Sequence, residues 1–253
     1  MNTYDKGLMW FRRDLRAQDN AALYHALKAC RQVWCVFVFD TEILDPLSRA
    51  DRRVEFIHAS VLELDTELRA MGARLGRERT GLIVRHAAAR EDIPRLARQL
   101  HVQAVFTNHD DEPSALARDA QVLGALAHAG VMLHSHKDHV VFERREVLTQ
   151  AGKFFSVFTP FKNACLKKLD EFHLTPYPSE ARVGSLAKDS NLTAPSLDHM
   201  GFKRTNLLDM IKPGEEGALD AFEDFLNRMD KYKVARDFPA IKGVSYLSVH
   251  NRF

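Results

Sequence analysis

Residues 7–16 read Gly-Leu-Met-Trp-Phe-Arg-Arg-Asp-Leu-Arg. The first five residues form an apolar run that is short enough for a buried strand. Three arginines then follow within five residues, and each guanidinium offers a planar fork of donors that suits carboxylates and phosphates. Asp14 is the nearest acidic partner, so a salt-bridged turn is the simplest interpretation of this charge. The stretch therefore predicts a buried strand that leads directly into a basic turn.

Strand-like and helix-like segments alternate from this stretch onward. Asn20 is placed to cap the first helix, and Pro113 suits the first turn of the fourth. The alternation predicts an α/β fold with a five-stranded, doubly wound parallel sheet. Strands are expected at residues 7–11, 32–39, 82–84, 104–107 and 131–134, with amphipathic helices at 21–30, 50–71, 92–100 and 113–128.

The amino-acid composition limits the classes of protein to which this chain can belong. The chain has 253 residues, of which 45% are hydrophobic and 28% charged, as in soluble globular proteins. A formal net charge of +2 means that any nucleic-acid partner would need a local basic patch. No apolar run approaches the ~18 residues of a membrane span, and residues 1–6 show no signal-peptide core. Cys30, Cys35 and Cys165 form no pairing pattern, so a reduced, cytoplasmic protein is expected.

Candidate site residues follow from the expected topology. Ligands of doubly wound sheets bind outside the carboxyl ends of the strands. Arg13 follows the first strand there, and Asp110 and Glu112 follow the fourth, so we expect the three on one rim. His134 and His136 share a strand face, but no further ligand is specified and no metal site is predicted. The sequence holds neither a GxGxxG nor a GxxxxGK[ST] motif, which leaves an ordinary dinucleotide site or a P-loop without support.

Three stretches resemble the DNA photolyase/cryptochrome family, and within it the class I cyclobutane pyrimidine dimer photolyases. Residues 10–20 follow the signature W-F-R-R-D-L-R-x-x-D-N. Residues 157–164, V-F-T-P-F-K-N-A, resemble the helix that packs between the family's two domains, with Cys165 where tryptophan is usual. Residues 232–248 resemble Y-x-x-x-R-D-F-P-x-x-x-G-T-S-x-L-S, with Val244 for a threonine and Tyr246 where arginine is frequent.

The resemblance covers essentially the whole chain, yet only the N-terminal half of a full-length family member. It implies an α/β antenna domain at 1–135 and an interdomain connector with a short helix at 136–212. The start of a truncated, all-helical FAD-binding domain is expected at 213–253. Catalytic residues are then expected beyond Phe253. Whether the sequence is a fragment or the protein continues stays open.

The resemblance also assigns roles to residues near the end of the chain. Tyr232 would lie against FAD, and Arg236 would contact a DNA phosphate. The FAD phosphates would be wrapped by Val244, Ser245, Tyr246, Leu247 and Ser248. A glycine-initiated loop exposes consecutive N–H groups to an anion, and serine hydroxyls add donors.

An antenna chromophore is the group that this half could hold. Residues 108–113 resemble the N-x-D-x-E-P wording of deazaflavin-binding photolyases, in which Arg13, Arg53, Asp110 and Glu112 would contact the chromophore. A folate antenna relies on an Asn-Glu pair, and the corresponding positions here are Ser114 and Ala115. A deazaflavin, or no antenna, is therefore favoured over methenyltetrahydrofolate. The alternative is that Asp110 and Glu112 merely interact with the helix dipole.

Family membership implies a deoxyribodipyrimidine photo-lyase, a carbon–carbon lyase. The full-length enzyme would repair pyrimidine dimers in DNA under light, by electron transfer from reduced FAD. The 253 residues alone are expected to be monomeric, inactive and poor at binding FAD. The alternatives are a cryptochrome-like blue-light photoreceptor without repair activity and a stand-alone α/β nucleotide-binding domain.

Overall fold

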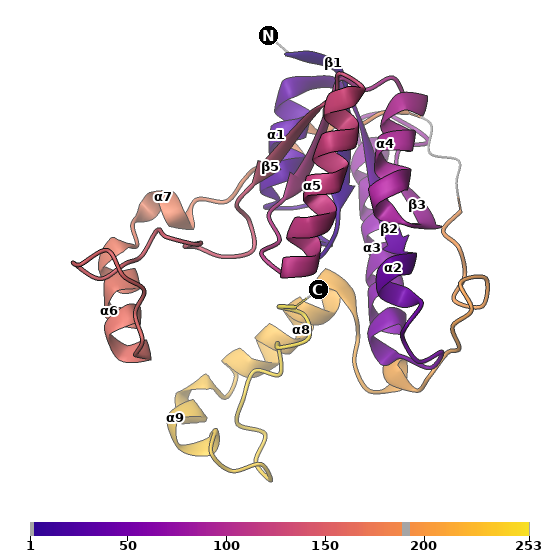
Figure 1. Ribbon diagram of the computed structural model, residues 1–253. Helices are drawn as coiled ribbons and strands as arrows, with labels where there is room; N and C mark the ends of the chain where they lie inside the picture. Colours follow the sequence, from indigo (N-terminus) through magenta and orange to yellow (C-terminus); the bar gives the residue numbers. More distant parts are fainter. Residues whose placement is uncertain (1–2, 189–192, 253) are drawn as a thin grey trace.

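The computed structural model describes residues 3–188 and 193–252, so the parts of the predicted domains at residues 1–2, 189–192 and 253 lie outside the described residues. Five parallel strands form one sheet in the order β3-β2-β1-β4-β5 (Figure 1). The strand order reverses at β1, which confirms the predicted doubly wound sheet. The strands are β1 (Tyr4–Phe11), β2 (Cys30–Asp40), β3 (Leu82–Ala87), β4 (Ala104–Asn108) and β5 (Met132–His136).

Helices cover both faces of the sheet (Figure 1). One face carries α1 (Ala21–Ala29) and α3 (Arg52–Ala73), and the other carries α4 (Ala89–Gln99) and α5 (Pro113–His128). Asn20 caps α1 as predicted, because its side chain accepts a hydrogen bond from the N–H of Leu23. The short α2 (Thr41–Leu44) forms where a loop was expected, and Asp40 caps it.

The two cores follow from the alternation of side chains along the strands. Met9 and Phe11 of β1 pack with α1 and α3, whereas Leu8 and Trp10 pack with α4 and α5. All four side chains are buried. A strand that is buried on both faces needs apolar residues at every position, and this is why the opening run could be identified from sequence.

The predicted connector is packed more closely than a linker. Part of it lies against the face of the sheet that α1 and α3 cover, where the N–H of Ala187 donates to the carbonyl of Val33 at 2.8 Å. Within it lie α7 (Glu171–Leu174), η1 (Ser179–Ser185) and η2 (Leu207–Asp209). Its apolar residues join the core without any helical or strand period, so sequence patterning could not reveal this packing. They are Val183, Leu186, Leu197, Met200 and Phe202.

The remaining helices stand apart from the sheet (Figure 1). They are α6 (Phe158–Lys168), α8 (Gly214–Leu226) and α9 (Tyr232–Ala235), with η3 (Met229–Lys231) between the last two. No residue of α6 or α7 is buried. Helix α8 contacts α3 and buries only Gly217. Among the described helices, none has both the length and the apolar character that crossing a bilayer requires.

Candidate functional site

A buried polar cluster holds the turn after β1 at the point where the strand order reverses. Asp14 is almost fully buried and accepts hydrogen bonds from the N–H of Arg12 at 2.7 Å and from Asn108 Nδ2 at 2.6 Å. Asn20 Nδ2 donates to the same carboxylate at 3.2 Å. Asn108 in turn accepts from the N–H of Ala22. The cluster therefore joins the end of β1, the end of β4 and the start of α1.

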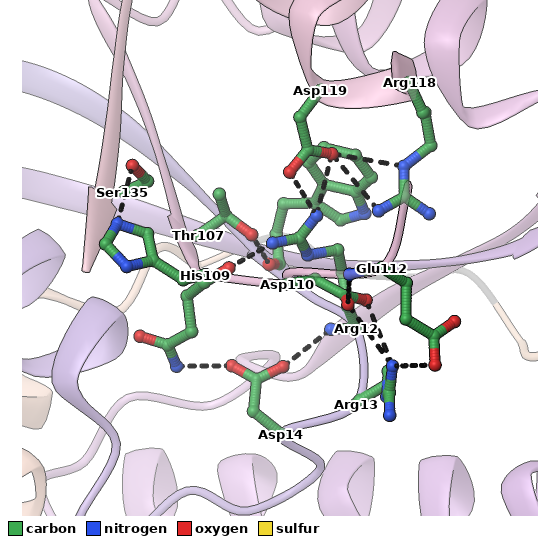
Figure 2. A network of polar contacts seen from close by, with 12 residues as sticks. Arg12, Arg13, Asp14, Thr107, His109, Asp110, Glu112, Arg118, Asp119 and Ser135 are labelled. Carbon is green, nitrogen blue, oxygen red and sulfur yellow. Dashed lines mark hydrogen bonds and ion pairs between the residues drawn. The ribbon is translucent and has the colours of Figure 1, made fainter. Parts of the chain in front are cut away.

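Because Asp14 is occupied by these donors, the arginines of the turn pair with other segments (Figure 2). Arg12 donates to Asp119 of α5 at 2.7 Å. Arg16 lies 2.9 Å from Asp138, which follows β5. The simple interpretation, in which Asp14 forms the salt bridge with these arginines, is thus wrong. Asp14 instead orders the backbone of the turn, and the guanidinium groups pair with acidic residues from distant parts of the chain.

Arg13, Asp110 and Glu112 come together as the topology predicted. Arg13 Nη1 lies 3.3 Å from Asp110 Oδ1 and 3.1 Å from Glu112 Oε1 (Figure 2). Glu112 also forms an ion pair with Arg252 from the end of the chain. The rim of the sheet is therefore tied to the C-terminal segment.

Arg53 takes a different position. It lies in the first turn of α3, where its guanidinium pairs with the N-capping Asp51 at 2.6 Å and is mostly exposed. This hydrogen bond to Arg53 lowers the pKa of the Asp51 carboxyl. No contact joins Arg53 to the carboxylates of the rim in the part of the chain that the structure describes.

Two guanidinium groups pack against the Trp10 ring. Those of Arg12 and Arg118 each lie 5.0 Å from the ring centroid. Both arginines also pair with Asp119, Arg118 at 3.2 Å. Trp10 is 2% exposed, so this arrangement packs the strand end tightly. The sequence motif includes Trp10 and Arg12. Their partners on α5, Arg118 and Asp119, lie outside the motif and could not be predicted from it.

A cavity of about 310 Å³ lies beside the turn that follows β1, which we call the arginine turn (residues 12–16). The turn contributes Arg13 and Arg16, α3 contributes Phe56, and the start of α8 contributes Glu215. His250 closes it from the C-terminal segment. The sequence interpretation missed Glu215 and His250, because neither belongs to a strand end or to a recognised motif.

Buried carboxyl groups give the cavity unusual acid–base properties. Burial raises the pKa of Glu215, and the nearby Glu67 adds to this effect, while Arg16 opposes it. Burial likewise raises the pKa of Asp138, against the opposing charge of Arg16. Carboxyl groups with raised pKa values in a cavity beside arginines are typical of binding sites.

The residues predicted to bind FAD and DNA lie in the C-terminal segment. Tyr232 begins α9 with its ring 5.8 Å from that of Phe225. The guanidinium of Arg236 lies 5.6 Å from the Tyr232 ring centroid. Tyr246 adopts a left-handed backbone conformation with φ of 58° and is half exposed.

Arg228 and the backbone N–H of Asn251 both contact the predicted phosphate-binding loop. Arg228 donates to the carbonyl of Val244 at 2.8 Å. The N–H of Leu247 lies 3.5 Å from Ser245 Oγ. For Ser248, no side-chain hydrogen bond is found within residues 3–188 and 193–252. The assignment of this loop to the FAD phosphates therefore rests on its sequence pattern.

Comparison with known proteins identifies a family and relatives that this chain resembles. A family model described as DNA photolyase matches residues 7–181. A deoxyribodipyrimidine photo-lyase of Synechococcus sp. is 31% identical over 257 residues, which cover 97% of this chain and 50% of that protein. An uncharacterized 31.6 kDa protein of another Synechococcus strain is 28% identical, with 99% of this chain and 86% of that protein covered.

Solved structures show the same architecture. A class III photolyase from Agrobacterium tumefaciens superposes with a TM-score of 0.80 at 25% identity, over 98% of this chain and 50% of that one. An archaeal photolyase from Sulfolobus tokodaii, described with two FAD molecules, gives a TM-score of 0.72 at 25% identity, over 98% of this chain and 51% of that one. The chain thus spans about half the length of these two structures and of the Synechococcus photo-lyase. By the family match, which covers well over half of its residues, this chain belongs to the DNA photolyase family.

Proposed function

We propose that this chain is the antenna-bearing half of a light-dependent enzyme that repairs cyclobutane pyrimidine dimers in DNA. The observation that carries the proposal is the pairing of Arg13 with Asp110 and Glu112 beside a cavity at the carboxyl edge of the sheet. Relatives named deoxyribodipyrimidine photo-lyase support the reaction. Reduced FAD would supply the electron that splits the dimer, and the protein would position the reactants.

The antenna chromophore is proposed to occupy this cavity. Its volume of about 310 Å³ and its charged rim suit a planar ring with polar edges. We propose a deazaflavin or flavin rather than a folate, in keeping with Ser114 and Ala115 at the folate positions. The Sulfolobus tokodaii photolyase, described with two FAD molecules and the implication of a novel light-harvesting cofactor, supports a flavin-type antenna. Arg13 lines the cavity and would contact the polar edge of the ring, while Asp110 and Glu112 would hold the Arg13 guanidinium in place. A contact from Arg53 would require that residue to leave Asp51.

The FAD site is proposed at Tyr232 and at the loop 244–248, with Arg236 directed to DNA phosphate. The fit is supported by the backbone of the loop. A Cβ atom at Gly243 would lie 2.6 Å from the carbonyl of Ala235 in α9. Glycine therefore allows the start of the loop to pack closely against α9. Tyr232 at the start of α9 and Tyr246 within the loop are both partly exposed. We propose that these residues form one wall of the FAD site, so that the isolated chain binds FAD weakly and repairs nothing.

The test is to fuse residues 1–253 to the second half of the Synechococcus photo-lyase and compare the fusion with the chain alone. We expect flavin absorption bands and light-dependent loss of thymine dimers only in the fusion. Circular dichroism and size-exclusion chromatography would establish that both proteins fold. Flavin bands in the short chain would contradict the proposed division of the FAD site. Dimer loss in the dark, or none under light in a folded fusion, would contradict the proposed reaction.

A further inference from the structure

Three side chains at the β5 end of the sheet form a hydrogen-bonded chain that the proposed function does not use. His109 Nε2 lies 3.1 Å from Ser135 Oγ (Figure 2). On the other side of the ring, His109 Nδ1 lies 2.7 Å from Glu143 Oε1 and 2.8 Å from Glu143 Oε2. A hydroxyl, an imidazole and a carboxylate joined in this order form the arrangement that activates a serine nucleophile.

The sheet places the serine and the histidine on the same face. Ser135 of β5 lies opposite Thr107 of β4, and His109 is two residues beyond Thr107. Because side chains alternate along a strand, these three project to the same side. The N–H of His109 also donates to the carbonyl of His136 at 2.7 Å, which fixes the backbone of His109 beside β5.

Glu143 comes from the segment after β5, where a second acid holds its turn. The N–H of Glu143 donates to Glu146 Oε2 at 3.0 Å, and the N–H of Glu146 donates to the carbonyl of Glu143 at 3.0 Å. Lys137 Nζ lies 2.8 Å from the same carboxylate of Glu146. The side chain of Glu143 is 9% exposed and that of His109 is 25% exposed, whereas Ser135 is an exposed residue. The hydrogen-bonded chain therefore runs from a mostly buried carboxylate to a hydroxyl that solvent can reach.

The direction of these hydrogen bonds follows from the carboxylate. A carboxylate can only accept, so Nδ1 of His109 carries the proton that it donates to Glu143. In the neutral ring Nε2 is then an acceptor, and it faces the hydroxyl of Ser135. His109 is therefore held in the tautomer that can take the proton from Ser135 Oγ as a general base.

A backbone donor lies beside the same hydroxyl. Strand β5 is at the edge of the sheet, and the N–H of Met132 and the carbonyl of His136 both bond to the β4 side. Backbone groups of alternate residues in an edge strand point to opposite sides, so the N–H of Ser135 points to the outer edge. Within residues 3–188 and 193–252, no strand pairs with that edge. An oxyanion that forms on a group bound to Ser135 Oγ can accept from this N–H.

We propose that Ser135, His109 and Glu143 form a triad that hydrolyses small esters. Ser135 Oγ attacks the carbonyl carbon of the ester while its proton passes to His109 Nε2. The ester C–O bond then breaks, and the alcohol leaves with that proton. Water next attacks the acyl carbon and gives a proton to His109, the bond to Oγ breaks, and Oγ takes that proton back as the carboxylic acid leaves. Glu143 acts through His109 as a positioning residue, and neither light nor flavin takes part.

The test is hydrolysis of p-nitrophenyl acetate in the dark by the 253-residue chain, followed by the release of p-nitrophenol. We expect Ser135→Ala and His109→Phe each to lower the rate at least about tenfold, because each removes the base-assisted attack. Ser156→Ala removes another exposed serine and is the matched control, which should leave the rate unchanged. Circular dichroism establishes that each variant is folded.

A fluorophosphonate probe identifies the nucleophile directly, since the bond from Oγ to phosphorus forms as fluoride leaves. Mass spectrometry of peptides from the labelled, unmodified chain should place the phosphonyl group on Ser135. Glu143→Ala should slow this labelling at least about tenfold. Nitrogen NMR of the same variant should show that His109 changes from the Nδ1–H tautomer to a mixture, which a loss of stability alone would not produce.

Three results would each overturn the inference. They are the absence of labelling in the folded, unmodified chain, labelling confined to residues other than Ser135, and an ester hydrolysis rate in Ser135→Ala equal to that of the parent. The first two need only the unmodified chain, so they hold even if a variant fails to fold.

Discussion

Asp14 is the residue on which the architecture of the rim depends. Its carboxylate has side-chain and backbone donors from three segments and is 3% exposed. The sequence could predict that Arg13, Asp110 and Glu112 share a rim, because parallel strands end at the same edge of a sheet. It could not predict Glu215 or His250, because their positions depend on how α8 and the C-terminal segment pack.

Replacing Asp14 should therefore destabilise the fold strongly. Asp14→Ala removes the acceptor of the N–H of Arg12 and of one Nδ2–H of Asn108, whose other Nδ2–H still donates to Asn20 Oδ1, and it should lower the free energy of unfolding by about 3 kcal/mol. The matched control is Asp111→Ala, an exposed acid that pairs with Arg144 at 3.0 Å and should cost at most about 0.5 kcal/mol. Urea unfolding monitored by circular dichroism measures both, and equal losses would contradict this role of Asp14.

A stacked pair of histidines introduces a pH dependence. His136 lies face to face with His25, with ring centroids 4.3 Å apart and an interplanar angle of 7°. Burial lowers the pKa of His136 from 6.5 to about 4, and the neighbouring His25, His134 and His109 act in the same direction. Burial, Lys28 and His134 also lower the pKa of His25. The folded state therefore favours neutral rings.

We expect the free energy of unfolding to fall as the pH is lowered from 6.5 to about 4. In this window the unfolded chain binds a proton at His136 that the folded chain does not, whereas above it His136 is neutral in both states. After allowance for partial exposure, the effect should be about 1–2 kcal/mol. His136→Phe keeps a ring against His25 and should flatten the dependence, as measured by urea unfolding at several pH values. A variant whose pH dependence matches the parent would argue against this assignment.

At the scale of elements, the periodic spacing of apolar residues determined which helices and strands could be predicted from the sequence. The strands and α1, α3 and α5 could be placed because each repeats its apolar residues with the period of its structure. The packed connector has no such period, although Phe202 within it is 2% exposed. At the start of α8 the backbone is held by a side chain of α3, because Glu63 accepts from the N–H of Glu216 at 2.9 Å.

Gly214 is required at this contact. It has φ of +77°, and a Cβ atom there would lie 1.7 Å from Glu63 Oε2. Gly214→Ala should therefore detach the start of α8 from α3 and increase hydrogen exchange across residues 214–226 by at least about tenfold. Gly124→Ala is the matched control, because that exposed glycine of α5 has open space around it and should stabilise the helix by about 0.5–1 kcal/mol. Unchanged exchange in Gly214→Ala would show that Glu63 does not hold α8.

At the scale of the whole molecule, apolar side chains are distributed unevenly. The sheet and its helices enclose two well-packed cores, whereas α6 and α7 bury no residue. Phe158 is 72% exposed and Phe172 is 79% exposed. Exposed aromatic residues gathered on helices that stand away from the core indicate a surface for another protein segment. If the proposed function is correct, the second half that longer relatives possess covers this surface.

The substitution Phe158→Asp should affect the 253-residue chain and the fusion protein differently. Phe158→Asp should change the free energy of unfolding of the 253-residue chain by less than about 0.5 kcal/mol, because the side chain is already in water. In the fusion with the Synechococcus half, the same charge would be buried without a partner, so FAD content and light-dependent repair should fall at least about tenfold. Asn163→Asp adds the same charge at another exposed position of α6 and tests whether the effect is specific to the aromatic surface. Flavin absorbance per mole of protein measures the outcome. Equal FAD content in Phe158→Asp and the parent fusion would mean that α6 stays exposed in the extended protein, and the second half would then have to pack elsewhere.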